Sequence, residues 1–183
     1  MRRAVVLPAR FQFTEELEVD ETFVGGVKTG KRGRGGAGKS LVLIAAEVRG
    51  VRIGRIRLLV FPNSTATTLI SAVEDLVERG SNVVTDGLGS YAGLTKSGYN
   101  HTLSRHTPEV GGYLLPHVHR VAALSKRWLL GTHQGAVSHQ RLQVYLDEFV
   151  FRFNRGAASS RGLLFHRLLV QVLKNEPIPR ARL

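Results

Sequence analysis

The first β-strand of the domain is predicted in the stretch Leu17-Glu18-Val19-Asp20-Glu21-Thr22-Phe23-Val24. Its apolar opening leads to Asp20. A second short strand pattern, residues 82–84, leads to Asp86, and Gly87 after it lets a ligand approach the backbone closely. A lone aspartate of this kind more often hydrogen-bonds to a turn. Because both strands are expected at the centre of the sheet, the pair indicates two carboxylates that converge.

A polar helix face is expected to close off this pair. His119 precedes Lys126 by seven residues, which is two helical turns, so both side chains point the same way from a helix predicted over 118–130. The small Ala123 leaves room between them. A histidine on a helix is more often structural than a ligand, but two aspartates under such a face indicate a divalent-metal site.

The remaining pattern predicts an α/β layer fold with a mixed β-sheet. Strands are expected over 17–24, 41–48, 54–61, 81–85 and 99–104, and helices over 65–79, 89–97, 118–130 and 137–154. Ser64 is placed to cap the first helix. The aromatic rings of Phe149 and Phe153 are expected in the core.

The chain is strongly basic. Its 26 Lys and Arg against 14 Asp and Glu give a formal net charge of +12 over 183 residues, which attracts polyanions such as DNA, RNA or an anionic membrane. Charge alone fits a structural RNA-binding protein equally well. There is no cysteine, which excludes disulfides and a thiolate zinc ribbon in this sequence. No apolar run approaches the roughly 18 residues of a membrane helix, so we expect a soluble, cytoplasmic protein that does not contact a membrane.

A glycine-rich segment, residues 33–40, fits the phosphate-loop pattern G-x-x-x-x-G-K-[ST]. That motif works only where a helix follows, and here the apolar run 41–46 predicts a strand. We therefore expect a basic connection that straddles a nucleic-acid backbone, with a merely solvated loop as the alternative, and no helix starting at Lys39. The cations expected to contact phosphates are Lys28, Lys31, Arg32, Arg34, Lys39, Arg120, Arg127, Arg152 and Arg155. Asn154 is expected to be exposed beside the last two.

Four stretches together carry a family resemblance: VDETFVGG at 19–26, VTDG at 84–87, KRWLLGTH at 126–133 and YLDEFVFRFN at 145–154. In order and spacing the chain resembles insertion-sequence transposases of the DDE superfamily, in particular the ISXO-like transposase domain. The resemblance implies an RNase H-like fold of about five strands flanked by helices. It also implies metal-dependent DNA strand cleavage and strand transfer.

The resemblance assigns roles to the four candidate residues. Asp20 and Asp86 match the first and second catalytic acids, His119 stands in the third acidic slot, and Lys126 matches the lysine seven residues later. Asp20, Asp86 and His119 would hold two Mg²⁺ or Mn²⁺ ions roughly 4 Å apart around the scissile phosphate. Many relatives carry Glu where this chain has His119, and imidazole is a poorer magnesium ligand than carboxylate, so we expect the second ion to be held weakly or through water.

The expected organisation is an N-terminal remnant over 1–17 without the usual zinc ribbon, a catalytic domain over 18–155 and a basic tail over 156–183. The expected partner is DNA, both transposon ends and target, bound by a homo-oligomer. The chain could be a truncated or inactive copy. The alternatives are a non-catalytic nucleic-acid-binding protein derived from such an enzyme, and an RNase H-like nuclease without strand transfer.

Overall fold

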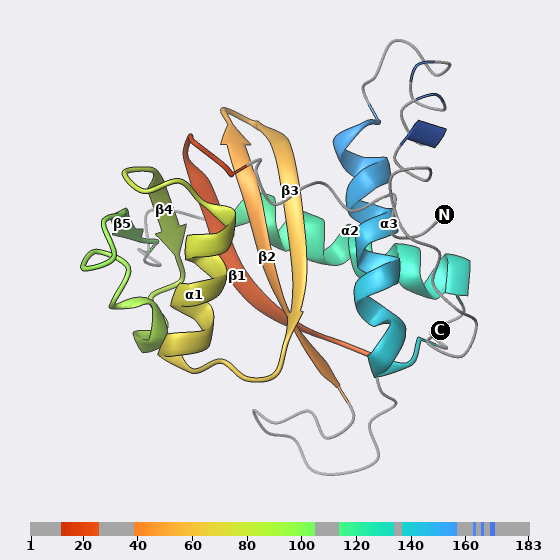
Figure 1. Cartoon of the computed structure of the whole chain (residues 1–183), viewed down its shortest axis with the longest axis horizontal. Coiled ribbons are helices and arrows are strands. Elements are labelled where there is room, and N and C mark those ends of the chain that lie inside the picture. Colours follow the sequence, from red (N-terminus) through yellow and green to blue (C-terminus); the bar gives the residue numbers. More distant parts are fainter. Residues whose placement is uncertain are drawn as a thin grey trace.

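The computed structural model describes residues 12–25, 39–104, 114–133 and 137–156, and positions 163, 166, 169 and 170. It contains a five-stranded sheet of order β3-β2-β1-β4-β5 (Figure 1). The strands are β1 (Leu17–Val24), β2 (Ser40–Arg49), β3 (Arg52–Phe61), β4 (Asn82–Thr85) and β5 (Asn100–Leu103). The first three form an antiparallel meander, whereas β4 pairs parallel to β1 and β5 parallel to β4. The predicted mixed α/β sheet is confirmed, with β1 at its centre.

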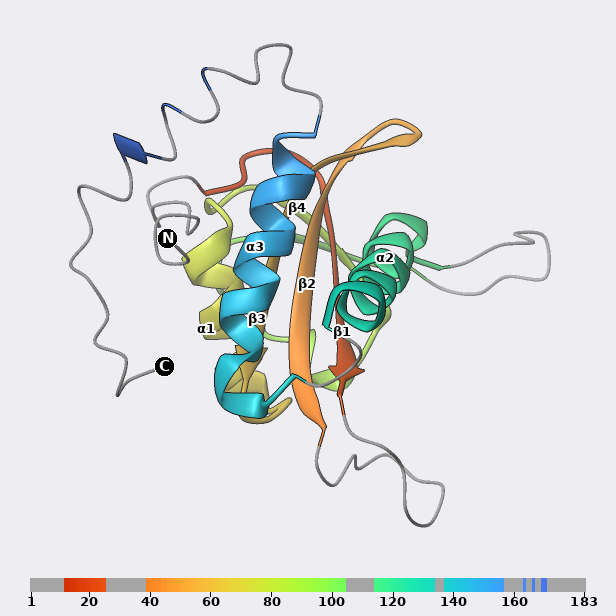
Figure 2. The same ribbon diagram turned by 90° about the vertical axis from the view of Figure 1, so that its right-hand side faces the viewer.

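Three helices cover the sheet, namely α1 (Ala66–Leu76), α2 (Pro116–His133) and α3 (Leu142–Asn154). Viewed along the sheet, α1 and α2 lie on opposite sides of it (Figure 2). Two buried clusters match this division, because successive strand residues point to opposite faces. Leu17 and Val19 of β1 pack on the α1 side, and Val42 and Ile44 of β2 pack against α2 and α3. Asp20 therefore projects toward α2.

Helix α1 is shorter than its sequence pattern predicts, and its first residue is preceded by a different N-cap. It ends at Leu76 because Val77 adopts an extended conformation and forms a parallel bridge with Phe13. Phe13 donates its amide to Leu76 O at 2.9 Å and accepts from the Glu78 amide at 2.8 Å. The prediction that Ser64 caps the helix is wrong. The N-cap residue is Thr65, whose side chain makes no capping hydrogen bond, and Asn63 Oδ1 accepts from the Thr65 amide at 3.2 Å in the turn before the helix.

Helix α3 seals the open edge of the sheet along β3, beside which it lies in Figure 1. Asn154 Oδ1 accepts from the Ile56 amide at 2.7 Å, and its Nδ2 donates to Ile56 O at 3.0 Å. Gln143 does the same further along β3: its Oε1 accepts from the Val60 amide at 2.7 Å, and its Nε2 donates to Leu58 O at 3.0 Å. An edge strand otherwise presents unpaired backbone groups to other chains. Two side chains of α3 thus take the place of a neighbouring strand.

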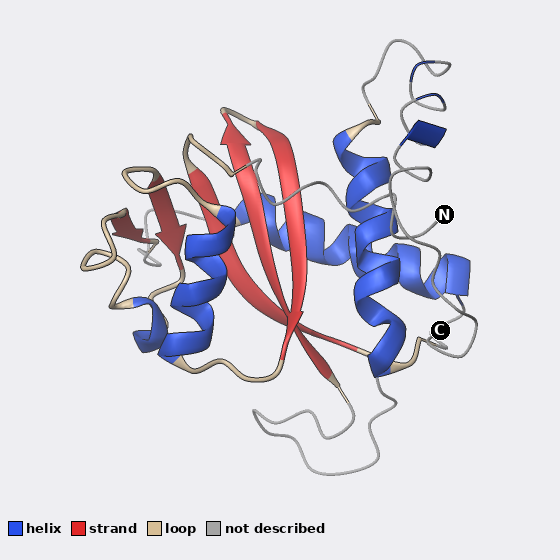
Figure 3. Cartoon of the chain, in the orientation of Figure 1, coloured by secondary structure: helices blue, strands red, loops and turns tan. Residues whose placement is uncertain are grey.

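Other elements depart from the predictions only in extent (Figure 3). The helix expected over 89–97 is one 3-10 turn, Gly89–Tyr91, followed by turns. Strand β2 begins at Ser40, so no helix starts at Lys39 and the expectation against a phosphate loop is confirmed there. In the described part of the chain, no helix is long and apolar enough to span a membrane.

Candidate active site

The two aspartates predicted to form a site end up at the same place on neighbouring parallel strands. Leu17 of β1 lies opposite Val83 of β4, and Glu18 lies opposite Val84. The same offset carried two residues further pairs Asp20 with Asp86, just beyond the last residue of β4. Their side chains are close enough for the charge of Asp86 to act on Asp20. Parallel pairing therefore places Asp20, in the middle of β1, beside Asp86, just after the end of β4.

The turn after β4 holds Asp86 in place. Asp86 is exposed, and its Oδ1 accepts from the Leu88 amide at 3.0 Å. Gly87 has φ of +87°, a conformation that glycine adopts without the strain of a side chain. Behind it, the buried Thr85 Oγ1 lies 2.9 Å from His101 Nε2 of β5. The Asp-Gly pair therefore forms a tight turn that presents a carboxylate.

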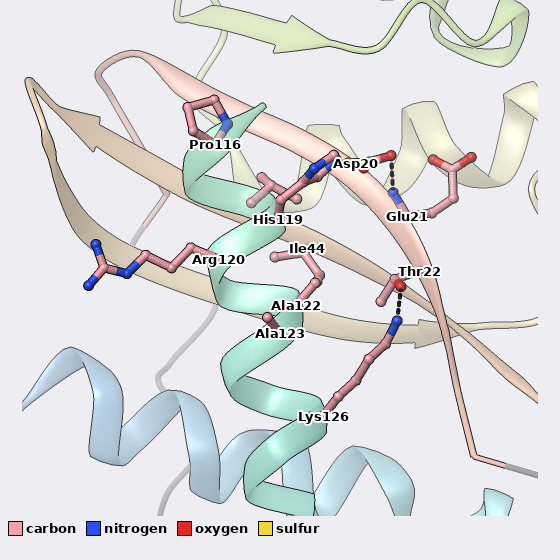
Figure 4. Close-up of a pocket in the computed structure, with 11 residues that line it drawn as sticks. Asp20, Glu21, Thr22, Ile44, Pro116, His119, Arg120, Ala122, Ala123 and Lys126 are labelled. Carbon is pink, nitrogen blue, oxygen red and sulfur yellow. Dashed lines mark hydrogen bonds and ion pairs between the residues drawn. The ribbon is translucent and has the colours of Figure 1, made fainter. Parts of the chain in front are cut away.

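Helix α2 brings His119 and Lys126 to the same cleft, as their spacing predicts. The cleft has a volume of about 770 Å³ and is lined by residues of β1, β2 and α2. His119 Nε2 lies 3.3 Å from Asp20 Oδ2. Two turns further along, Lys126 Nζ donates to Thr22 Oγ1 at 2.7 Å (Figure 4). The helix face therefore runs along β1, with one contact at each end of the cleft.

The electrostatics of the cleft favour a cation beside Asp20. Burial raises the pKa of Asp20, and the charge of Asp86 raises it further. The Glu21 amide, which donates to Oδ1 at 2.8 Å, and His119 both lower it. Burial lowers the pKa of Lys126, and the nearby Lys39 lowers it further. One end of the cleft thus concentrates negative charge and the other positive charge.

Comparisons with known proteins identify the family and the fold of the chain. The family profile of the ISXO2-like transposase domain matches residues 12–154. The chain belongs to this family. A solved structure, the catalytic core domain of BIV integrase, matches with a TM-score of 0.51 and 16% sequence identity, covering 88% of this chain and 98% of that one. This likeness concerns the fold, and it confirms the predicted RNase H-like class. No curated protein sequence matches the chain.

The cations predicted to bind phosphates do not all face the cleft of the transposase domain. Lys28, Lys31, Arg32 and Arg34 lie outside the described residues. Arg120 and Arg127 are exposed on α2, and Arg120 points away from Asp20 at the rim of the cleft (Figure 4). Lys39 is half-buried just before β2. Contact with phosphate stays a prediction for each of these cations.

Of the three polar residues that are predicted to be exposed at the end of α3, only Arg152 is exposed, and nucleic-acid binding by Arg152 and Arg155 stays a prediction. Asn154 is not free for nucleic acid, because both ends of its amide bond to Ile56. Arg152 is exposed but pairs with Glu148 at 2.9 Å. Arg155 is half-buried, with its guanidinium 4.3 Å from the centre of the Phe151 ring. Edge sealing uses both the donor and the acceptor of the Asn154 amide.

Sequence reasoning missed the polar residues that surround the candidate acids. Tyr91 is fully buried on the α1 side, and its hydroxyl donates to Glu21 Oε2 at 2.8 Å. Burial raises the pKa of Glu21, and the hydrogen bond from Tyr91 lowers it. The charges of Asp20 and Asp86 raise it further. Burial also raises the pKa of Tyr91, and the carboxylate of Glu21 adds to this. The alternation of β1 could have shown that Glu18, Asp20 and Thr22 share the face opposite Glu21.

Proposed function

We propose that this transposase domain catalyses metal-dependent cleavage and transfer of DNA strands during movement of an insertion sequence. The observation that supports this most is the placement of Asp20, in the middle of β1, beside Asp86, just after the end of β4, with His119 3.3 Å from Asp20. Lys126 from the same helix face supplies a positive charge beside them. Asp20, His119 and Lys126 come from β1 and α2 and line one cleft, and Asp86 follows the neighbouring strand β4.

The donor chemistry fits a divalent ion. Among the described residues, no three His, Cys, Asp or Glu side chains form a ready-made metal cage. Magnesium is usually held by one or two carboxylates, with water and substrate phosphate oxygens filling the other positions. A half-buried carboxylate whose pKa is raised beside a second one suits such an ion. We propose Asp20 and Asp86 as ligands of Mg²⁺ or Mn²⁺ and His119 as the third, weaker one.

When bound, the ions would activate the attacking oxygen and stabilise the charge that develops on the phosphate and the leaving oxygen. The chain's own residues do the positioning. The Glu21 amide fixes Asp20 Oδ1, leaving Oδ2 on the cleft side beside His119. His119 Nε2 could alternatively exchange a proton with Asp20 or with a substrate oxygen. Lys126 uses one of its three N–H donors on Thr22, so two are left for a phosphate oxygen.

The proposed substrate is DNA, comprising the ends of the insertion sequence and its target, held by a homo-oligomer in the cytoplasm. The net charge of +12 supports a polyanionic partner. Binding through phosphates releases condensed counterions, so log affinity for duplex DNA should fall by about 0.9 per contact for each unit of log salt. Affinity that does not change with salt would count against a nucleic-acid substrate.

The test combines a manganese-dependent nicking and joining assay with a salt-dependent DNA titration. We expect Asp20→Asn to abolish nicking and to leave DNA affinity equal or slightly higher, because one negative charge near the backbone is removed. Lys126→Ala should weaken both. The matched controls are Asp75→Asn and Lys96→Ala, which change exposed residues of the same types outside the cleft.

Each alternative has its own outcome. Salt-sensitive binding with no nicking by the unmodified chain would contradict the enzymatic proposal and favour a non-catalytic nucleic-acid-binding protein. Nicking that depends on Asp20 but never joins strands would favour an RNase H-like nuclease. Nicking that survives Asp20→Asn would show that the cleft between β1 and α2 is not the active site.

A further inference from the structure

A buried carboxylate, Glu18, lies two residues before Asp20 on the same face of β1. Its exposed fraction is 6%. Burying an ionisable group is unfavourable unless its oxygens are well paired. No lysine or arginine forms an ion pair with Glu18 among the described residues. The partners that it has instead all belong to the start of one helix.

Both oxygens of Glu18 are used by the first turn of α2. Oε2 accepts from the Val118 amide at 2.9 Å, and Oε1 lies 2.6 Å from His117 Nδ1. The other ring nitrogen of His117 lies 3.2 Å from Gly50 O, in the turn between β2 and β3. A carboxylate at this position satisfies an amide that has no partner within the helix, and it faces the positive end of the helix dipole. Ordinary helix caps come from an adjacent residue, whereas this one is 100 residues away in the sequence.

Three alternate residues of β1 make polar contacts with α2, and Glu18 is the first of them. Glu18, Asp20 and Thr22 alternate along the strand, and they meet Val118, His119 and Lys126 in the same order. From Glu18 to Thr22 a strand advances about 13 Å, and from Val118 to Lys126 a helix advances about 12 Å. Between the two outer contacts, the strand and the helix therefore advance by similar distances along the cleft.

A register of this kind depends on where the helix begins. Moving α2 by one residue along its sequence would turn each side chain by about 100° around the axis. His119 would then leave Asp20, and Lys126 would leave Thr22. Glu18 is the contact at the N-terminal end of α2, so it sets the register for the two contacts that follow.

We propose that Glu18 is a positioning residue, which anchors the first turn of α2 so that His119 faces Asp20 and Lys126 faces Thr22. Its significance for catalysis rests on the proposed function, whereas its effect on the placement of His119 does not. Glu18 acts through α2 and does not itself touch the substrate. Partners one step removed from a reacting group typically alter activity by about 10- to 100-fold when they are changed.

The experiment uses the full chain with Glu18→Ala, Glu18→Gln and the matched control Glu47→Ala. Glu47 is also a buried carboxylate, 1% exposed, but it lies on the α1 face and accepts from the Arg55 amide at 2.8 Å. Imidazole signals of ¹³C-labelled histidine report on His119, which is assigned by its loss in His119→Gln. The spectrum of Asp20→Asn gives the signal of His119 without the carboxylate.

We expect Glu18→Ala to move the His119 signal toward its position in Asp20→Asn, and Glu47→Ala to leave it in place. Glu18→Gln should largely restore it, because its amide oxygen can accept from Val118 and its amide nitrogen can donate to His117. An unmoved His119 signal in folded Glu18→Ala would overturn the proposal, whether or not the protein cleaves DNA. An equal movement in Glu47→Ala would overturn it too, since any loss of a buried carboxylate would then suffice.

Cleavage supplies a second readout. Single-turnover nicking should fall about 10- to 100-fold in Glu18→Ala at unchanged DNA affinity, recover in Glu18→Gln and stay unchanged per folded molecule in Glu47→Ala. A moved His119 signal with an unchanged nicking rate would refute the role in positioning for catalysis. If the unmodified chain does not nick DNA, the proposed function fails, and the histidine spectra alone decide whether Glu18 places His119.

Discussion

Asn154→Ala is expected to destabilise the domain by opening the sealed edge of β3. The substitution removes the acceptor of the Ile56 amide and the donor to Ile56 O, at 2.7 and 3.0 Å. Ile56 is fully buried, so water cannot replace these partners without rearrangement of α3. The change therefore leaves backbone groups unpaired inside the protein, which is more costly than losing an exposed hydrogen bond.

The size of the effect follows from these two groups. A buried polar group left without a partner costs about 1–3 kcal/mol. In Asn154→Ala both the amide and the carbonyl of Ile56 lose their partner, and a carbonyl tolerates this better than an amide. The expected loss of stability is therefore about 2–4 kcal/mol. Alanine is the better helix former and offsets a few tenths of this at most. Against a total stability of about 5–15 kcal/mol for a domain, the loss is large.

Urea unfolding followed by circular dichroism measures the loss. With a denaturant slope near 2 kcal/mol per molar, the midpoint should fall by about 1–2 M. The control is Arg152→Ala in the same helix, which removes an exposed ion pair with Glu148 and should change stability by about 0.5 kcal/mol or less. DNA affinity should be unchanged in Asn154→Ala. Equal midpoints for the two variants would refute edge sealing, and a selective loss of DNA affinity would restore the sequence-based role of Asn154 in nucleic-acid binding.

Three further outcomes are expected around the cleft. In metal-free protein, Asp20→Asn should raise the free energy of unfolding at neutral pH, because burial and the charge of Asp86 raise the pKa of Asp20 and disfavour its ionised form. The gain should vanish below the ordinary pKa of 3.8, where the carboxyl group is protonated in the folded and unfolded states alike, and a gain that is constant with pH would contradict the cause. For the same reason, manganese affinity measured by calorimetry should rise as the pH increases through the raised pKa of Asp20, and a flat profile would remove Asp20 from the ligands. Tyr91→Phe should cost about 1.5–3 kcal/mol in thermal unfolding, since its hydroxyl donates to the carboxylate of Glu21, and Tyr99→Phe, whose hydroxyl donates to a carbonyl, should cost less.

The sequence by itself determined the central strands and the side of the helix that faces them. The pattern of residues 17–24 predicts β1 with its observed bounds, because alternation and β-branched residues are local properties. The spacing of His119 and Lys126 predicts a shared face, because helical geometry repeats over seven residues. Asp20 and Asp86 are recognisable as a pair for the same reason, since each follows a strand pattern.

Only the tertiary structure decided which polar residues support that pair. Helix α1 stops at Leu76 because Phe13, which lies 64 positions before Val77, forms a bridge with Val77. Asn154 looks like an exposed residue in its own helix, but its side-chain amide hydrogen-bonds to an edge strand 98 residues away. Glu18 looks like an ordinary strand glutamate, and it caps a helix 100 residues later. A polar side chain has the same local pattern whether it meets water or a distant backbone group, so its partner is known only once the sheet and helices have packed.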